Sequence, residues 1–188
     1  MSADKEIIVV GTGIDSSRVQ VTYRSKDEDG NWKQVFSVPG FCGFHGMAAE
    51  EKREGDRRTP IGTWGFVCAF GILPDPGSVL PYKELDEDDY WVDDGNSEFY
   101  NQMVSTNTTA RTWASAEHLI EMDPAYRYGL AMDYNVREQV RGKGSAIFLH
   151  GINPPHEYTE GCIAISEEYV RLLVQQVDEY TKIVIVPE

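Results

Sequence analysis

Short apolar, β-branched segments recur along this chain, and their pattern predicts strands more often than helices. Residues 18–23 and 32–38 are two such segments, and the polar run 27–30 between them (Asp-Glu-Asp-Gly) predicts a hairpin. The same reasoning predicts eight strands in all, at residues 6–10, 18–23, 32–38, 63–70, 128–133, 145–150, 162–165 and 182–186.

One segment has clear helical periodicity. Ser166 is suited to a helix N-cap, and two glutamates follow it in the first turn. Apolar residues then recur at i, i+3, i+4 and i+7, which predicts a helix over 166–177. A second helix is predicted over 115–122, ahead of Pro124. The apolar repeat of the helix over 166–177 consists of Val170, Leu173, Val174 and Val177.

Many strands and few helices indicate a mainly β fold.

Length and charge limit the possible partners. With 188 residues and 41% hydrophobic content, the chain can bury one core, so we expect a single domain over 1–188. The formal net charge of −14 argues against nucleic acid and anionic membrane surfaces as partners. We find no apolar window long enough for a membrane span and no export signal at the start of the sequence given.

Three cysteines are too few for a disulfide scaffold. Alternation places Cys68 on the core face of its strand with Trp64, Phe66 and Phe70, which indicates packing. Cys42 lies in a glycine-rich loop, where it is either free or paired with Cys68. Both arrangements leave Cys162 as the odd thiol.

Cys162 follows His150 by twelve residues, and each lies at the end of a predicted strand. A cysteine performs acyl transfer as a thiolate, so it needs a base within reach and backbone N–H groups to hold developing negative charge. His150 is the candidate base, and Gly161 leaves room for a substrate carbonyl. The alternative is a small buried cysteine with an ordinary core histidine. His156 is a rival base on a proline-rich loop, and His150, His156 and Cys162 could instead be zinc ligands.

The motifs around these residues resemble a known family. His150-Gly151 followed by Thr159-Glu160-Gly161-Cys162-Ile163 is similar to the His-Gly … Ser/Thr-x-Gly-Cys-Ile/Val signature of the L,D-transpeptidase (YkuD) family. Residues 52–63, with Glu-Gly-Asp and Thr-Pro-Ile-Gly, resemble a second motif of that catalytic domain, and residues 90–94, 100–101 and 128–135 resemble its small bacterial members. The likeness runs from Val38 to Val186, so residues 1–37 are expected to add N-terminal strands to a family-like region over 38–188. It implies a β-sandwich-like fold with a few short helices.

The resemblance also implies a reaction, for which no cofactor or metal is expected. The substrate would be the tetrapeptide stem of peptidoglycan, cut after the L-centre of its diamino third residue with release of D-alanine. Cys162 would form a thioester, His150 would act as base and then acid, and the backbone after the histidine, here Gly151, would orient the imidazole. N–H groups of Gly161 and Cys162 would form the oxyanion hole, and Thr159 would either brace the loop or be an ordinary loop hydroxyl. An amine acceptor gives a transpeptidase and water gives an L,D-carboxypeptidase.

The same resemblance implies a cell-envelope location, so a signal or anchor was removed or export uses another feature; we expect a monomer. The chain departs from the commonest pattern at two positions. Ala164 replaces an arginine, and the loss of that cation puts donor recognition in doubt. Glu160 replaces a histidine, and close to the thiol its charge would oppose the thiolate. A wall-binding module without turnover, or a different cysteine hydrolase, therefore remain alternatives. The candidate substrate-binding residues, which could equally form a turn network or be surface groups, are Asp93, Asp94, Tyr100, Asn101 and Arg58.

Overall fold

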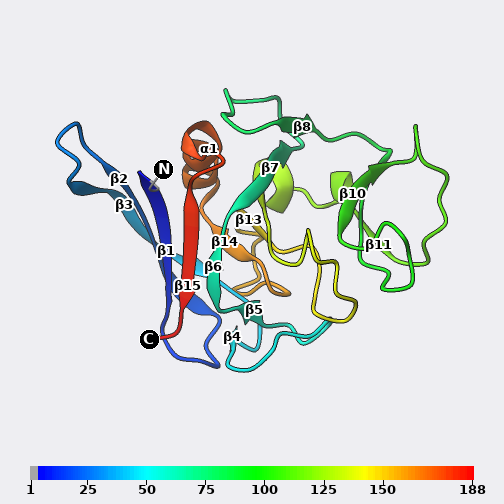
Figure 1. Cartoon of the computed structure of the whole chain (residues 1–188), viewed down its shortest axis with the longest axis horizontal. Helices are drawn as coiled ribbons and strands as arrows, with labels where there is room; N and C mark the ends of the chain where they lie inside the picture. Colours follow the sequence, from blue (N-terminus) through cyan, green and yellow to red (C-terminus); the bar gives the residue numbers. More distant parts are fainter. Residues whose placement is uncertain (1–3) are drawn as a thin grey trace.

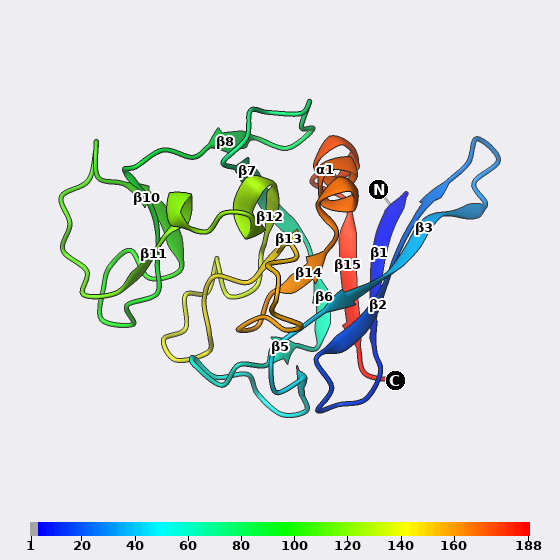
Figure 2. The same cartoon turned by 180° about the vertical axis from the view of Figure 1, so that it is seen from behind.

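The computed structural model describes residues 4–188 and is mainly β, as the sequence predicts (Figures 1 and 2). One sheet contains most of the strands. Their order across the sheet is β6-β15-β1-β2-β3-β14-β13-β12-β7-β8. Their bounds are β1 (Lys5–Gly11), β2 (Arg18–Lys26), β3 (Trp32–Phe41), β6 (Gly62–Trp64), β7 (Phe66–Gly71), β8 (Tyr82–Glu84), β12 (Gly129–Met132), β13 (Phe148–Gly151), β14 (Ile163–Ile165) and β15 (Lys182–Val186).

This sheet curls on itself. Strand β6 is at one end of the order and β7 is next to the other end, yet only Gly65 separates them in the sequence. The two edges must therefore approach each other, which encloses a core between the two halves of the sheet. The predicted strand 63–70 is wrong at this point, because the chain bends at Gly65, whose N–H donates to Asp133 Oδ1 at 2.7 Å.

The predicted strand 145–150 is also shorter than expected. Ala146 has a φ of 53°, which is incompatible with extended backbone, so β13 begins only at Phe148. The N-terminal hairpin is confirmed: β2 and β3 pair antiparallel, with Val21 opposite Val38. Strands β1–β3 thus belong to the same sheet as the rest of the chain.

Two small sheets complete the β structure. Strands β9 (Asp89–Val92), β10 (Gln102–Ser105) and β11 (Ala116–His118) form a three-stranded sheet at the side of the large one, opposite the β2–β3 hairpin (Figure 1). Strands β4 (Met47–Ala48) and β5 (Thr59–Pro60) form a short parallel pair. The predicted helix over 115–122 is wrong: β11 pairs with β9, and a single 3-10 turn, η1 (Leu119–Glu121), follows. Strand pairing outweighs the local preference there.

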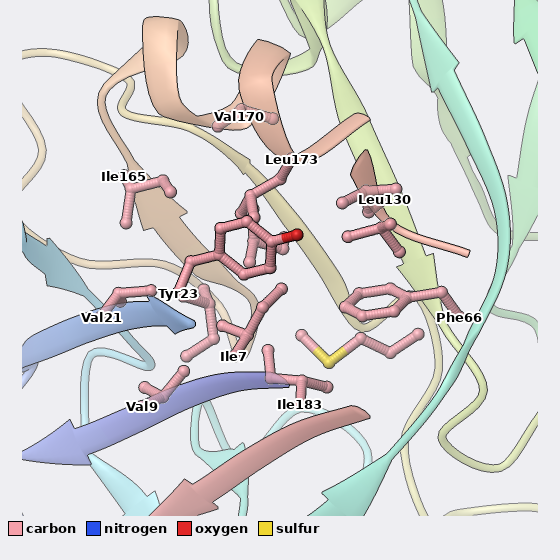
Figure 3. Close-up of a cluster of buried hydrophobic side chains, with 14 of the residues drawn as sticks. Ile7, Val9, Val21, Tyr23, Phe66, Leu130, Ile165, Val170, Leu173 and Ile183 are labelled. Carbon is pink, nitrogen blue, oxygen red and sulfur yellow. The ribbon is translucent and has the colours of Figure 1, made fainter. Parts of the chain in front are cut away.

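The predicted C-terminal helix is confirmed as α1 (Glu167–Gln176). Ser166 occupies the N-cap position, although its side chain makes no capping hydrogen bond. Val170 and Leu173 are fully buried and project onto Ile7, Tyr23 and the other side chains of the core (Figure 3). Neither α1 nor any other helix among residues 4–188 is long and apolar enough to cross a membrane.

All three cysteines are free thiols. The alternative in which Cys42 pairs with Cys68 is therefore wrong for this structure. Cys42 is buried in the main core, whereas Cys68 packs against a second cluster that contains Phe70, Phe148 and Cys162. The packing role predicted for Cys68 is confirmed, and Phe70 lies in the same cluster. The predicted shared face with Trp64 and Phe66 is wrong, because Phe66 belongs to the main core and Trp64 packs against it. The register shift between β7 and β12, between Phe66 and Cys68, breaks the alternation there.

Candidate active site

Strand register brings His150 and Cys162 together. Strands β13 and β14 are parallel neighbours, with Leu149 opposite Ile163. One residue earlier in that register, Cys162 lies beside Phe148, and its Sγ accepts a hydrogen bond from the Phe148 N–H at 3.3 Å. Side chains alternate along a strand, so His150 projects from the same face as Phe148. The two candidate catalytic side chains are thus diagonal neighbours on one face, and both line the same pocket.

The His150 imidazole has a fixed orientation. Its Nδ1 lies 2.7 Å from the Gly151 carbonyl oxygen. A carbonyl can only accept, so Nδ1 carries the proton and Nε2 keeps a free lone pair. Burial lowers the pKa of His150 to about 4, against the opposite effect of that carbonyl, so the ring is neutral at pH 7. The resemblance implied that the backbone after the histidine orients the imidazole, and the Gly151 carbonyl oxygen makes this contact. A Cβ at Gly151 would come within 3.2 Å of the Ala125 carbonyl oxygen.

The Cys162 thiol is also neutral at rest. Its Sγ–H donates to the Ala146 carbonyl oxygen at 3.2 Å. Burial raises the pKa of Cys162 to about 12, and the negative charge of Glu117 adds to the rise; the Phe148 N–H and Lys52 act in the opposite direction. The free protein therefore holds both the thiol and the imidazole in their neutral forms.

Two threonines hold the loop that carries the thiol. Thr159 Oγ1 donates to the Cys162 carbonyl oxygen at 2.7 Å and accepts from the Gly161 N–H at 3.1 Å. Thr59 Oγ1 donates to the Gly161 carbonyl oxygen at 2.8 Å and accepts from the Gly43 N–H at 2.9 Å. The Gly161 N–H is thus used within the loop. The N–H of Cys162, which has no partner among residues 4–188, is the better candidate for an oxyanion donor.

Replacing Thr59 with valine should destabilise this loop. The change keeps the shape but removes the donor to Gly161 and leaves the buried Gly43 N–H unpaired, at a cost of about 1–3 kcal/mol. Urea unfolding should show this loss as a lower midpoint for Thr59→Val protein. The matched change Thr63→Val, on an exposed residue, should alter stability by about 0.5 kcal/mol or less. Equal unfolding midpoints for the two variants would contradict the bracing role of Thr59.

The shared pocket has a volume of about 400 Å³ and contains several charged groups. Lys52 lines it and is the one lysine or arginine among residues 4–188 that does so. Its side chain is buried, with Nζ 2.7 Å from Asp56 Oδ1 and 3.1 Å from the Arg53 carbonyl oxygen. The acidic lining residues are Glu54, Asp93, Glu117 and Glu160.

Glu160, which replaces the family histidine, is paired at the rim of the pocket. Arg57 Nε and Nη2 donate to its two carboxylate oxygens at 2.6 and 2.7 Å. The guanidinium also lies over the Phe44 ring, 4.2 Å from its centroid. Glu160 contributes to the raised pKa of Cys162, as the sequence suggested, but its effect is smaller than that of Glu117. Ala164 is buried in β14.

Of the five candidate substrate-binding residues, only Asp93 lines the pocket. Asp94 instead accepts hydrogen bonds from the Ala114 and Asn96 N–H groups. Arg58 donates to the Met47 carbonyl oxygen and pairs with Asp15. For these two residues, a contact with substrate stays a prediction.

Tyr100 and Asn101 lie behind the pocket wall. The Tyr100 hydroxyl donates to Glu54 Oε2 at 2.7 Å. Asn101 Oδ1 accepts from Trp91 Nε1 and from the Ala146 N–H, both at 3.0 Å. Asn101 thereby fixes Ala146, whose carbonyl oxygen accepts the hydrogen bond from the Cys162 thiol. Their role in substrate binding also stays a prediction.

Several pocket residues were missed by sequence reasoning. Glu117 and Tyr126 line the pocket, and the Tyr126 hydroxyl donates to Glu117 Oε2 at 2.7 Å. Glu117 lies in the segment predicted as helix, so no pattern placed it near Cys162. The rival base His156 also lines the pocket, but it is exposed and packs on Tyr158. Within residues 4–188, no set of three or more His, Cys, Asp or Glu side chains is arranged to hold a metal ion.

Comparison with known proteins gives one family match. The family model of the L,D-transpeptidase catalytic domain (YkuD) matches residues 7–185 of this chain. No curated protein matches the chain. Among solved structures, the helical cell shape determining protein Pgp2 from Campylobacter jejuni is similar with 18% identity and a TM-score of 0.48, covering 98% of this chain and 49% of that one. The Ldtfm-avibactam carbamoyl enzyme is similar with 11% identity and a TM-score of 0.45, covering 100% of this chain and 50% of that one. The chain spans about half the length of each.

Proposed function

Because the chain belongs to the L,D-transpeptidase catalytic-domain (YkuD) family, we propose that it transfers an acyl group from a peptidoglycan stem tetrapeptide to an amine through a thioester on Cys162. One observation carries this proposal. Cys162 and His150 share a pocket, and the Gly151 carbonyl leaves Nε2 of His150 as the proton acceptor. A thiol with a fixed base at a cavity is the arrangement that acyl transfer requires.

The reaction begins with attack on the carbonyl at the L-centre of the third residue. As Sγ bonds to the carbonyl carbon, the thiol proton passes to Nε2 of His150. The oxyanion accepts a hydrogen bond from the Cys162 N–H. The imidazolium then protonates the amine of the leaving D-alanine, the C–N bond breaks, and the thioester remains.

The second half returns the enzyme to its resting state. An acceptor amine attacks the thioester carbon and gives a proton to Nε2, and the departing sulfur takes that proton back. Water in place of the amine releases a tripeptide instead. Since stem peptides lie outside the cytoplasmic membrane, we place this activity in the cell envelope, within one catalytic domain that acts as a monomer.

The test uses purified protein with a disaccharide tetrapeptide, followed by mass spectrometry. A peptide dimer with loss of D-alanine is the expected product. Tripeptide alone would show that water is the acceptor and replace the transpeptidase assignment with an L,D-carboxypeptidase. Folded protein that gives neither product and no thioester on Cys162 would overturn the enzymatic proposal and favour a wall-binding module.

A further inference from the structure

Two carboxylates of the small sheet face the candidate active site. Glu117 on β11 lies opposite Trp91 on β9. Asp93 directly follows the end of β9, two residues after Trp91. The Trp91 ring packs against Phe148, with centroids 4.8 Å apart, in the cluster that includes Cys162. The face of the small sheet that carries Trp91 and Glu117 is therefore turned toward the thiol, and both carboxylates line its pocket.

These carboxylates lack a cation. Neither Glu117 nor Asp93 forms an ion pair with any group of residues 4–188. Glu117 Oε2 accepts from the Tyr126 hydroxyl, but Asp93 Oδ1 is buried and has no hydrogen-bond partner among the same residues. A buried, unpartnered carboxylate oxygen is costly, so its presence in a pocket wall needs an explanation. A cationic ligand would supply one.

The structure favours an ammonium group over a metal ion. No three acidic, histidine or cysteine side chains among the described residues are placed to ligate a metal. Burial, with the negative charge of Asp93 adding to it, raises the pKa of Glu117 to about 7. In their ionised forms the two carboxylates only accept hydrogen bonds, and a primary ammonium offers three donors. Lys52, the one lysine or arginine among residues 4–188 that lines this pocket, is already paired with Asp56. Its charge is therefore not available to these carboxylates.

We infer that Glu117 and Asp93 form a subsite that binds the primary ammonium group of a diamino side chain while the acyl group is held at Cys162. This inference rests on the proposed function, because the stem tetrapeptide carries such an ammonium on its third residue. The ammonium comes either from the donor stem itself or from the incoming acceptor. In both cases it brings a positive charge toward the carboxylate that most opposes ionisation of the Cys162 thiol.

The first experiment measures binding without turnover. Cys162→Ala protein is titrated with tetrapeptide that has a free side-chain amine and with the same peptide acetylated on that amine. The free amine should bind about 10- to 100-fold more tightly, the range for charge-assisted hydrogen bonds. Adding Glu117→Gln or Asp93→Asn should remove most of this preference. Glutamine keeps the size of the side chain and can still accept from Tyr126, so the fold is preserved.

The second experiment separates the two sources of the ammonium. D-alanine release from free-amine and acetylated donors reports the donor source, and the acceptor KM for dimer formation in Glu117→Gln protein reports the acceptor source. A loss confined to D-alanine release assigns the subsite to the donor, and a loss confined to acceptor KM assigns it to the acceptor. The matched control Glu121→Gln removes an exposed carboxylate that is not part of the pocket wall and should leave both values unchanged.

The outcomes distinguish this inference from the proposed function. If wild-type protein releases no D-alanine from any donor, while Cys162→Ala protein still prefers the free amine, the subsite stands and the catalytic proposal fails. If donors react but Glu117→Gln and Asp93→Asn proteins discriminate between the two peptides as the wild type does, with unchanged acceptor KM, the subsite is overturned. A structural defect in the variants would weaken the binding of both peptides equally, and this result would also overturn the subsite.

Discussion

Replacing Cys162 with alanine should abolish D-alanine release and dimer formation together. Both half-reactions pass through a bond to Sγ, so no partial activity survives its removal. The expected loss in kcat is on the order of 10⁶-fold, because removing the nucleophile alone costs about as much as removing the whole set of catalytic groups. Mass spectrometry of products and of the intact protein checks this, because the thioester adduct should disappear as well.

The fold should tolerate this substitution. Cys162 loses one atom, with its hydrogen bonds to the Ala146 carbonyl oxygen and from the Phe148 N–H. Thermal unfolding should therefore remain cooperative. Cys68→Ala is the matched control, since Cys68 packs in the same hydrophobic cluster and does not line the pocket. Continued D-alanine release by Cys162→Ala protein, with Cys68→Ala protein unchanged, would show that another group carries the acyl chain.

The pair of catalytic candidates could be predicted because its determinants are local. His150-Gly151 and the Thr159–Cys162 segment each lie at a strand end, and parallel pairing of β13 and β14 joins them. The neutral state of the pair could not be predicted. It depends on burial and on Glu117, and both arise from the packing of the small sheet against the large one.

The remaining pocket depends on contacts between distant segments. Lys52 and Glu54 belong to a motif visible in the sequence, yet the partner of Glu54, the Tyr100 hydroxyl, is 46 residues away. Asn101 similarly reaches Ala146 across 45 residues. Such contacts leave no periodic signal, so the motif indicated a site without indicating what each residue does. The error at Glu117 has the same origin, because pairing with β9 overrode a helical pattern.

The structure suggests how a neutral pair can react. Moving a proton from a thiol with a pKa of about 12 to an imidazole with a pKa of about 4 is strongly unfavourable in the free protein. Substrate has to change this balance, either by bonding to sulfur as the proton leaves or by placing positive charge near Glu117. A resting thiol of this kind is also protected from unwanted oxidation and alkylation, since the thiolate is the reactive form.

Replacing His150 with alanine should lower kcat/KM for D-alanine release by about 10²–10⁴-fold, the usual contribution of a positioned general acid and base. The pH dependence gives a sharper test. Burial disfavours the imidazolium, so the base stays competent as pH falls and is lost only near the His150 pKa of about 4. Burial raises the pKa of Glu117, in the same pocket, to about 7, so the test uses Glu117→Gln protein. Its kcat/KM should show no acid limb near pH 6.5, the ordinary pKa of histidine.

A limb near pH 4 should appear in Glu117→Gln protein and vanish when His150→Ala is added, within the range where circular dichroism shows both proteins to be folded. His156→Ala supplies the comparison, because His156 lines the same pocket on an exposed loop. If His156→Ala protein lost the activity while His150→Ala protein kept it, the base would be misassigned. The Gly151 contact would then hold an imidazole that takes no part in proton transfer.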